Sequence, residues 1–342
     1  MVVVEGLWYL SKRLRREGVE GDHARRMNEN RMRRCNRCIL DTDHANEEYA
    51  DALIFHGPDL SHYKEVPKKR LAHQRYAFMT MEAPDNTFLS VPGNSPFLEK
   101  NFFNWTMTPL FSSDVIFKYG GFWVNAKEAE LRGFKVDASM AVDESSLANK
   151  IPSVFALISN CDTGSKRELG LKELAKYFNV TLAGHCAETD ELRTLCPKGQ
   201  ETCEKEEISK YAFFFAVENT ACVDYVSEKY WVRYTFPSIP IIMRRSDYKN
   251  LDFNSAKEMG EYLTKLAKDK TAYAEYFSWR RGGWTIAPWN SEGFRNGLCK
   301  MCERLWEDKP QTKMIEDIRE WYVTESQCDH GEFVSKWISG TN

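Results

Sequence analysis

The sequence has no apolar segment long enough to cross a membrane, no surplus of either charge and no glycine-rich nucleotide loop. Its longest apolar run is about Tyr211 to Val217, whereas a membrane-spanning helix needs about 20 residues. Lys and Arg number 47 against 50 Asp and Glu, and a net charge of -3 gives no reason to expect a nucleic-acid partner. Without a G-x-G-x-x-G motif or a Walker loop, nicotinamide and P-loop chemistry are not supported. These absences predict a soluble globular protein that binds no nucleic acid.

The length predicts more than one domain. One hydrophobic core serves about 250 to 300 residues, so a chain of 342 is expected to have two core-bearing domains. Residues 11–38 are rich in arginine and lack apolar periodicity, which is typical of a solvated arm. The apolar start of the chain is broken by Glu5 and has no basic region before it, so neither a signal peptide nor an anchor is expected. We expect a basic arm over 1–38, one domain over 39–150, a second over 151–295 and a cysteine-containing tail over 296–342.

The ten cysteines favour disulfides over a metal site. Two C-x-x-C pairs, Cys35 with Cys38 and Cys299 with Cys302, have the spacing of zinc knuckles, and His330 lies near the last cysteine. Zinc ribbons bring their two knuckles within about 15 to 20 residues of each other, whereas these pairs lie at opposite ends of the chain. We therefore expect disulfides, above all near the C-terminus, in a protein of an oxidising compartment. The spacing alone does not assign the pairs.

Two sequons for N-glycosylation occur. Asn104-Trp105-Thr106 lies in an aromatic segment that we expect to be buried. Asn179-Val180-Thr181 has no such surroundings, so Asn179 is the candidate acceptor.

Short apolar segments alternate with helical ones along most of the chain. Strands are expected over 52–56, 76–81, 153–158, 180–183, 211–217 and 239–243, and helices over about 166–178, from about 224, and over about 256–267. This alternation predicts an α/β fold with two parallel sheets wound by helices, divided near 149–152. In such sheets, ligands bind beyond the carboxyl ends of the strands. The candidate site residues are the polar ones directly after strands: Glu82, Ser159, Asn160, Glu218 and Asn219.

Glu82 stands between an apolar strand and a turn that contains Pro84. Partial desolvation in such a setting raises carboxyl pKa values toward the range of a general base. The alternative is a solvated turn glutamate, which is the commoner role for a charged residue in a loop.

Glu218 follows seven apolar residues, which is unusual for a surface glutamate. A helix from about Asp224 would place Glu228 and Lys229 three and four residues after Tyr225, on one face. An ammonium group there suits a diphosphate. The alternative is an ordinary exposed helix with a Glu and Lys pair.

Arg167 lies in the first turn of the helix that follows Ser159 and Asn160. Its charge and the partial positive charge of the helix N-terminus together predict a phosphate site, whereas the alternative is a solvated arginine. The triplet Asp41-Thr42-Asp43 could form a metal-binding D-x-D of the kind used by metal-dependent sugar transferases, although it precedes the first expected strand.

Several phrases of the sequence occur in a specific order. They are MEAPDN at 81–86, FNWTMTPLFSSD at 103–114, ISNC with a later arginine at 158–167, and FFFAVENT followed by DYVSEKYW at 213–231. ADALIFH at 50–56 and YFSW at 276–279 accompany them. Together they resemble the α-1,3-fucosyltransferase family, glycosyltransferase family 10, in its eukaryotic, invertebrate-like members. The resemblance covers about residues 50 to 280.

The resemblance implies a GT-B architecture, in which a Rossmann-like acceptor domain and a Rossmann-like GDP-fucose domain face each other across a cleft. It implies inverting transfer of L-fucose from GDP-β-L-fucose, in α-1,3 linkage, to GlcNAc of a glycoprotein or glycolipid glycan. No metal is obligatory in this scheme, and a divalent cation would be at most stimulatory. The family also implies the Golgi lumen, on the cisternal membrane where an anchor is present.

The resemblance also implies roles for the candidate residues. Glu82 resembles the general base of the family, and Glu218 would face the developing oxocarbenium charge. The implied donor-binding residues are Ser159, Asn160, Arg167, Asn219, Tyr225, Glu228 and Lys229, of which Arg167 and Lys229 would hold the diphosphate.

The chain also departs from the family pattern. Ala212 and Phe214 stand where relatives have Lys and Tyr, and the segment between Met243 and Asp252 is shorter than in relatives. Because that segment edges the donor site, the alternative function is a catalytically impaired relative that binds a glycan or a partner. A glycosidase is a further alternative, since paired carboxylates such as Glu82 and Glu218 also serve hydrolysis.

Overall fold

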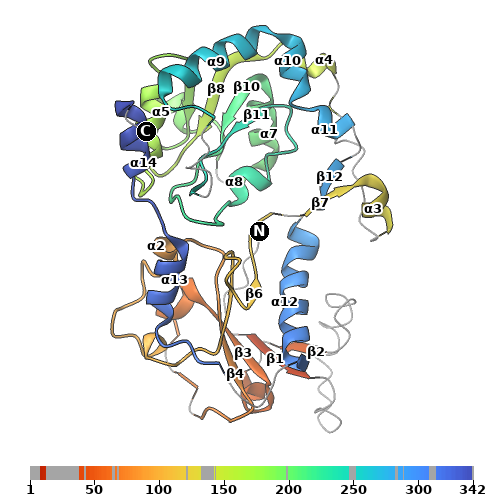
Figure 1. The fold of residues 1–342 in the computed structure, drawn as a ribbon, viewed down its shortest axis with the longest axis vertical. Helices are drawn as coiled ribbons and strands as arrows, with labels where there is room; N and C mark the ends of the chain where they lie inside the picture. The colour runs from red at the N-terminus through yellow and green to blue at the C-terminus, as the bar shows by residue number, and fades with distance from the viewer. Residues whose placement is uncertain are drawn as a thin grey trace. The chain divides into compact units, whose positions relative to one another are not determined.

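The computed structural model describes residues 8–12, 38–41, 44–63, 66–67, 69–120, 122–131, 142, 144–197, 199–245, 252–281, 284–287, 289–307 and 313–340. The chain divides into two compact units, each built from two stretches of sequence (Figure 1). Unit 1 comprises Met1–Tyr119 and Pro288–Gln327, and unit 2 comprises Gly120–Ala287 and Cys328–Asn342. The chain therefore passes from unit 1 to unit 2, back to unit 1, and again to unit 2.

Unit 1 contains a six-stranded sheet in the order β2-β1-β3-β4-β5-β6. Its strands are β1 (Trp8–Lys12), β2 (Cys38–Asp41), β3 (Ala52–His56), β4 (Arg75–Met79), β5 (Trp105–Thr108) and β6 (Val115–Ile116). The strands β3 to β6 are parallel, whereas β1 is antiparallel to both of its neighbours. The prediction of a solvated arm is wrong for Trp8–Lys12, because these residues pair with β3 and β2; residues 13–37 of that arm lie outside the described residues.

Helices from the end of the sequence cover both faces of this sheet. Helix α12 (Trp289–Glu307) packs Leu298, Met301 and Leu305 against one face, at the three- and four-residue spacing of a helical stripe. Helix α13 (Ile318–Ser326) packs Ile318 and Tyr322 against the other face. The sequence beyond residue 296 is therefore part of the core, and the expectation of a tail is wrong for these helices.

Unit 2 contains a fully parallel sheet in the order β11-β10-β8-β9. Its strands are β8 (Ile151–Leu157), β9 (Val180–Ala183), β10 (Tyr211–Phe215) and β11 (Ile239–Ile241). Helices α5 (Arg167–Leu174) and α9 (Ala256–Lys268) pack on the face that carries Val154 and Phe213. Helix α7 (Glu201–Lys210) packs on the face that carries Phe155 and Phe214. Successive strand residues thus point into opposite layers, as in a doubly wound sheet.

Shorter elements complete the two units. In unit 1 they are η2 (His44–Tyr49), η3 (Gly57–Ser61), α2 (Pro84–Thr87) and η4 (Pro96–Leu98). In unit 2 they are β7 (Phe122–Asn125), α3 (Ala126–Leu131), α4 (Glu144–Leu147), α6 (Asp190–Arg193), α8 (Glu228–Trp231), α10 (Lys270–Glu275), α11 (Ser278–Arg281), β12 (Trp284–Ala287) and α14 (Glu332–Ser339). The contacts place the first division of the chain at Tyr119 and Gly120, earlier than the expected 149–152, because β7 pairs antiparallel with β12.

Disulfides hold the two stretches of each unit together. In unit 1, Cys38 of β2 bonds to Cys302 of α12. In unit 2, Cys222 bonds to Cys328, next to a backbone bridge between Ala221 and Asp329. Cys161–Cys186 and Cys196–Cys203 are local, and Cys299 is also disulfide-bonded. The expectation of disulfides near the C-terminus is confirmed, and the C-x-x-C residues Cys38 and Cys302 bond to each other across the sequence.

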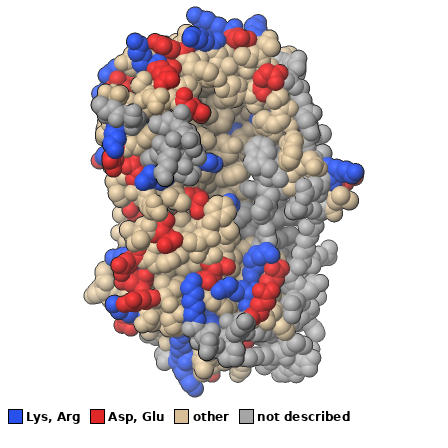
Figure 2. Space-filling model, in the orientation of Figure 1, with Lys and Arg blue, Asp and Glu red and all other residues tan. Residues whose placement is uncertain are grey.

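The described part of the chain has charged side chains of both signs on its surface and relatively short or polar helices (Figure 2). Figure 2 shows Lys and Arg side chains interspersed with Asp and Glu side chains on the face that it draws. No described helix is long and apolar enough to cross a bilayer.

Candidate active site

In unit 1, Glu82 lies just beyond the carboxyl end of β4, in the turn that leads into α2. Its main chain is fixed by three hydroxyl groups. The Glu82 N–H donates to Thr80 Oγ1 over 3.0 Å, and its carbonyl accepts from Tyr322 over 2.6 Å and from Thr87 over 3.2 Å. Burial, aided by the nearby Glu82 charge, raises the pKa of the Tyr322 hydroxyl far above its usual value, so it stays a donor.

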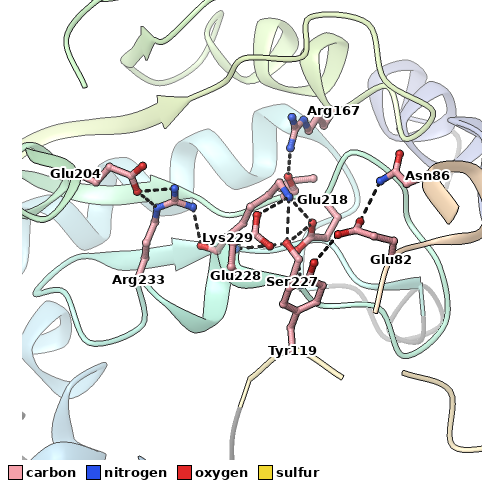
Figure 3. Close-up of polar contacts among 11 residues, drawn as sticks. Glu82, Asn86, Tyr119, Arg167, Glu204, Glu218, Ser227, Glu228, Lys229 and Arg233 are labelled. Atoms are coloured by element: carbon pink, nitrogen blue, oxygen red, sulfur yellow. Dashed lines mark hydrogen bonds and ion pairs between the residues drawn. The ribbon is translucent and has the colours of Figure 1, made fainter. Parts of the chain in front are cut away.

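The half-buried side chain of Glu82 accepts a hydrogen bond at each oxygen (Figure 3). The hydroxyl of Tyr119 donates to Oε1, and Nδ2 of Asn86 donates to Oε2 over 3.2 Å. Tyr119 follows β6 and Asn86 belongs to α2, so two separate segments aim their donors at one carboxylate. These two donors orient the carboxylate at the end of the turn.

In unit 2, Glu218 lies just beyond the carboxyl end of β10 and is only 3% exposed. Ser227 donates twice to its carboxylate, from its backbone N–H to Oε1 over 2.7 Å and from its hydroxyl to Oε2 over 2.8 Å. The ammonium of Lys229 lies 3.1 Å from Glu218 Oε2 and 3.0 Å from Ser227 Oγ (Figure 3). A buried carboxylate paired and hydrogen-bonded in this way holds the lysine at a fixed position.

Ser227 is also the N-cap of α8, since its hydroxyl accepts from the backbone N–H of Lys229. Glu228 is the next residue and the first of α8. Glu228 is exposed on α8. Partial desolvation would raise its pKa, but the charge of Lys229 and the N–H of Glu228 itself hold the pKa below its usual value. Glu228 is therefore ionised at neutral pH, and the edge of this site carries both charge signs.

The expected helix from about residue 224 is wrong. Asp224 has a φ of 60°, in the left-handed region, and Ser227 is extended, so the helix begins only at Glu228. Tyr225 is buried, but it lies in the segment before α8 and shares no helical face with Lys229.

Arg167 is the first residue of α5 and is 6% exposed. Its Nη1 donates to the carbonyl of Val217 over 2.6 Å, and its buried Nε has no hydrogen-bond partner among the described residues. Burial lowers the pKa of Arg167, and the charge of Glu218 opposes this. Arg167 also lines a cavity of about 700 Å³ within unit 2, together with Val217 and Arg244. A buried guanidinium with unused donors at a helix N-terminus is suited to an anionic group.

The remaining candidates differ in how closely they join this cluster. Ser165 links Asn219 to it, because its N–H donates to the Asn219 carbonyl and its hydroxyl donates to the Glu218 carbonyl. Ser159 and Asn160 are exposed after β8 and make no direct hydrogen bond to Glu218, Lys229 or Arg167 among the described contacts.

The other predicted sites lie apart from these clusters. Asn104 is buried, as expected, whereas Asn179 is exposed between α5 and β9. Asp41 ends β2, and Thr42 and Asp43 of the D-x-D triplet lie outside the described residues. Residues 246–251, in the segment after Met243 that the resemblance predicts to be short, also lie outside the described residues. The described residues contain no group of three or more His, Cys, Asp or Glu side chains placed to hold a metal ion.

Sequence reasoning missed four partners of these candidates. Tyr119 and Asn86 hold Glu82, and Ser227 holds Glu218. Arg233 donates to Glu204 Oε2 from Nε over 3.0 Å and from Nη2 over 2.6 Å, and also to the carbonyl of Lys229 over 3.3 Å, so it ties α8 to α7. Only Ser227 had a signal in the sequence, as a serine just before an acidic first helical turn.

Each unit has parallel strands covered by helices, and charged side chains follow the carboxyl ends of the strands. An α/β architecture of two such units is that of the GT-B class of glycosyltransferase. The fold class predicted from the sequence is confirmed.

Comparison with known families gives the family. The model of the glycosyltransferase family 10 (fucosyltransferase) C-terminal domain matches residues 147–321, and that of the fucosyltransferase N-terminal domain matches residues 9–120. The chain belongs to this fucosyltransferase family, as its resemblance predicted.

Individual relatives agree in sequence over most of the chain. Alpha-(1,3)-fucosyltransferase fut-5 of Caenorhabditis elegans is 28% identical over 89% of this chain and 79% of its own length. Alpha-(1,3)-fucosyltransferase C of Drosophila melanogaster is 27% identical over 80% of this chain and 66% of its own length. A crystal structure of an alpha1,3-fucosyltransferase with GDP-fucose aligns with 77% of this chain and 80% of that chain, with 17% identity and a TM-score of 0.46.

Proposed function

We propose that this protein transfers L-fucose from GDP-β-L-fucose to a GlcNAc hydroxyl of a glycan, in α-1,3 linkage and with inversion at C1. The observation that carries the proposal is the match of both fucosyltransferase domain models to this chain. The names of the curated relatives, which are α-(1,3)-fucosyltransferases, support the linkage.

In this proposal Glu82 is the general base. It takes the proton of the acceptor hydroxyl while the oxygen attacks C1 of fucose and the bond from C1 to the GDP oxygen breaks. A single displacement of this kind inverts the configuration. Hydrogen bonds at both carboxylate oxygens support the role, because a base must keep its orientation to take a proton efficiently.

Arg167 and Lys229 would balance the charge that develops on the leaving GDP. The unused Nε donor of Arg167 and the anchored ammonium of Lys229 support this role. Glu218 would place Lys229 and face the positive charge on the sugar ring, while Tyr225, Glu228, Asn219, Ser159 and Asn160 would surround the nucleotide. Because two cations serve the diphosphate, no obligatory metal is proposed.

The proposal includes a cellular place. Disulfides suit an oxidising compartment, and we propose the Golgi lumen, where glycoprotein glycans are built.

An assay with purified protein, GDP-fucose and a panel of GlcNAc-terminated and core N-glycan acceptors tests the function. Fucosylated product, with the linkage determined by mass spectrometry and NMR, is the expected result. GDP-fucose binding without product would instead favour a catalytically impaired relative, and release of free fucose from a fucoside would favour a glycosidase. Repeating the assay in excess chelator separates this mechanism from a metal-dependent one, because activity should persist.

A further inference from the structure

We infer that Ser227 is a positioning residue, whose hydroxyl fixes the ammonium of Lys229 in the place where the diphosphate of the donor meets it. The inference rests on the proposed function, because it concerns how this protein holds GDP. It gives Ser227 a part in donor binding that goes beyond its role as the N-cap of α8.

The hydrogen bonds of the Ser227 hydroxyl run in one direction (Figure 3). The ammonium of Lys229 can only donate, and the carboxylate of Glu218 can only accept. Ser227 Oγ lies 3.0 Å from Lys229 Nζ and 2.8 Å from Glu218 Oε2, so it accepts from the lysine and donates its single proton to the glutamate. The serine therefore links the ammonium to the carboxylate, and its direction is set by its two neighbours.

Burial preserves this link. Ser227 is 1% exposed and Glu218 is 3% exposed, so water hardly competes for the bonds between them. The backbone N–H of Ser227 also donates to Glu218 Oε1 over 2.7 Å, so each carboxylate oxygen has a donor from the same residue. The acceptors that face the ammonium are thus held in one arrangement before any ligand binds.

The main chain of Lys229 is held as well. Its N–H donates to Ser227 Oγ over 3.4 Å, and its carbonyl accepts from Arg233 Nη1 over 3.3 Å. Arg233 is anchored in turn by Glu204 of α7. The flexible four-carbon side chain of a lysine needs a restraint of its own at the ammonium. This side chain is 24% exposed, so the ammonium is restrained from the buried side while an anion can reach it from solvent.

Without the Ser227 hydroxyl, the ammonium would keep Glu218 at 3.1 Å and the more distant Glu228 Oε1 at 3.5 Å. It could then move between the two carboxylates, and only part of its conformations would suit the diphosphate. A ligand that binds only a fraction of the conformations binds more weakly in proportion to that fraction. Affinity for the diphosphate should therefore fall, whereas affinity for the nucleoside, which Lys229 does not contact in the proposed function, should not.

Three variants test this difference. Ser227→Ala removes the hydroxyl, Ser227→Thr keeps it as a rescue, and Ser255→Ala is the matched control. Ser255 is the N-cap of α9 in the same unit, and its hydroxyl accepts from the N–H of Glu258 over 3.2 Å. Both alanine variants therefore lose a helix cap, but only Ser227→Ala loses the link to Lys229.

For Ser227→Ala we expect calorimetry to show about tenfold weaker GDP binding and unchanged guanosine binding. The KM for GDP-fucose should rise by a similar factor while the KM for the acceptor stays the same. Ser227→Thr and Ser255→Ala should bind GDP like the wild type.

A second readout needs neither donor nor turnover. In protein with ¹⁵N-labelled lysine, the Nζ signal of Lys229 is assigned by its loss in Lys229→Met. An ammonium held by hydrogen bonds exchanges its protons with water slowly, so the signal should be sharp in the wild type, Ser227→Thr and Ser255→Ala. It should be broadened in Ser227→Ala.

Unchanged GDP affinity and an unchanged Lys229 signal in Ser227→Ala would overturn the inference. Equal effects in Ser227→Ala and Ser255→Ala, or an equal loss of guanosine and GDP binding, would also overturn it. If the methyl group of threonine is not accommodated, the comparison of the two alanine variants decides alone. A wild-type protein that binds GDP but transfers no fucose would refute the proposed function instead, and the Lys229 signal would still decide whether Ser227 positions the ammonium.

Discussion

The ammonium of Lys229 lies 3.1 Å from Oε2 of Glu218, and the carboxylate side of this pair is almost fully buried. Removing Lys229 leaves the buried Glu218 carboxylate without this counterion, whereas removing Glu218 leaves a partly exposed ammonium that still has Glu228 Oε1 at 3.5 Å. Removing one partner of such a pair is expected to cost more stability than replacing both partners together.

This relationship gives the first prediction. Lys229→Met should lower the free energy of unfolding by about 3 kcal/mol and Glu218→Gln by less, whereas the double variant should lower it by clearly less than the sum. Urea denaturation of the four proteins measures the coupling. Strictly additive losses would mean that the pair is not coupled in solution. Calorimetry on Lys229→Met should also show weaker GDP binding, because the ammonium is proposed to meet the diphosphate.

The second prediction separates binding from chemistry at Glu82. Glu82→Gln keeps the side-chain volume and an oxygen that accepts hydrogen bonds, but it cannot take a proton. GDP affinity should be unchanged while kcat falls about 100-fold or more, the usual scale for loss of a general base. Calorimetry and a fucose-transfer assay on the same preparation make the comparison. Wild-type turnover in this variant would assign the base elsewhere.

The third prediction compares two disulfides of unit 2. Cys222–Cys328 closes a sequence separation of 106 residues, whereas Cys196–Cys203 closes one of 7. A longer closed loop restrains the unfolded chain more, so Cys222→Ser/Cys328→Ser should lower the free energy of unfolding by about 4 kcal/mol and Cys196→Ser/Cys203→Ser by less. GDP binding should also weaken in the first variant, because Cys222 lies in the segment between Glu218 and Ser227. Equal losses of stability would contradict the loop-length argument.

The fourth prediction concerns the two sequons. Asn104 is 1% exposed, its Oδ1 accepts from the N–H of Tyr76 over 2.8 Å, and its Nδ2 donates to the carbonyl of Lys313 over 3.0 Å. Asn179 is exposed just before β9. Protein secreted from eukaryotic cells should therefore carry a glycan at Asn179 and none at Asn104. Peptide mapping by mass spectrometry gives the occupancy, and Asn179→Gln should remove all N-linked sugar.

The sequence predicted local elements well where apolar residues form a short uninterrupted run. The expected strands at 52–56 and 180–183 coincide with β3 and β9, and the helix expected over 256–267 is α9. The prediction of a helix from about residue 224 failed, because the left-handed backbone of Asp224 interrupts a segment with helical composition. Aspartate is enriched at positive φ, but most aspartates have negative φ, so the residue type alone did not predict this conformation.

The partners of the site residues were beyond sequence reasoning for a different reason. Tyr119 lies 37 residues from Glu82 and Tyr322 lies 240 residues from it, so their hydrogen bonds arise only once the sheet of unit 1 and α13 are assembled. Candidates placed directly after strands were found, because the geometry of parallel sheets brings such positions to one edge. Ser227 could be predicted in part: its role as the N-cap of α8 is local, but its bonds to Glu218 depend on the packing of β10.

The bond between Cys38 and Cys302 spans 264 positions and joins β2 to α12, which is synthesised after the whole sheet of unit 2. While the ribosome is still adding the second unit, the nascent first unit lacks both of the helices that will cover its sheet. The usual order, in which an N-terminal domain folds before the next one is made, therefore does not apply, because each unit is completed by a later stretch of the chain. The contiguous sheet of unit 2 can form on the growing chain, whereas Cys38 cannot form its bond to Cys302 before α12 has been synthesised.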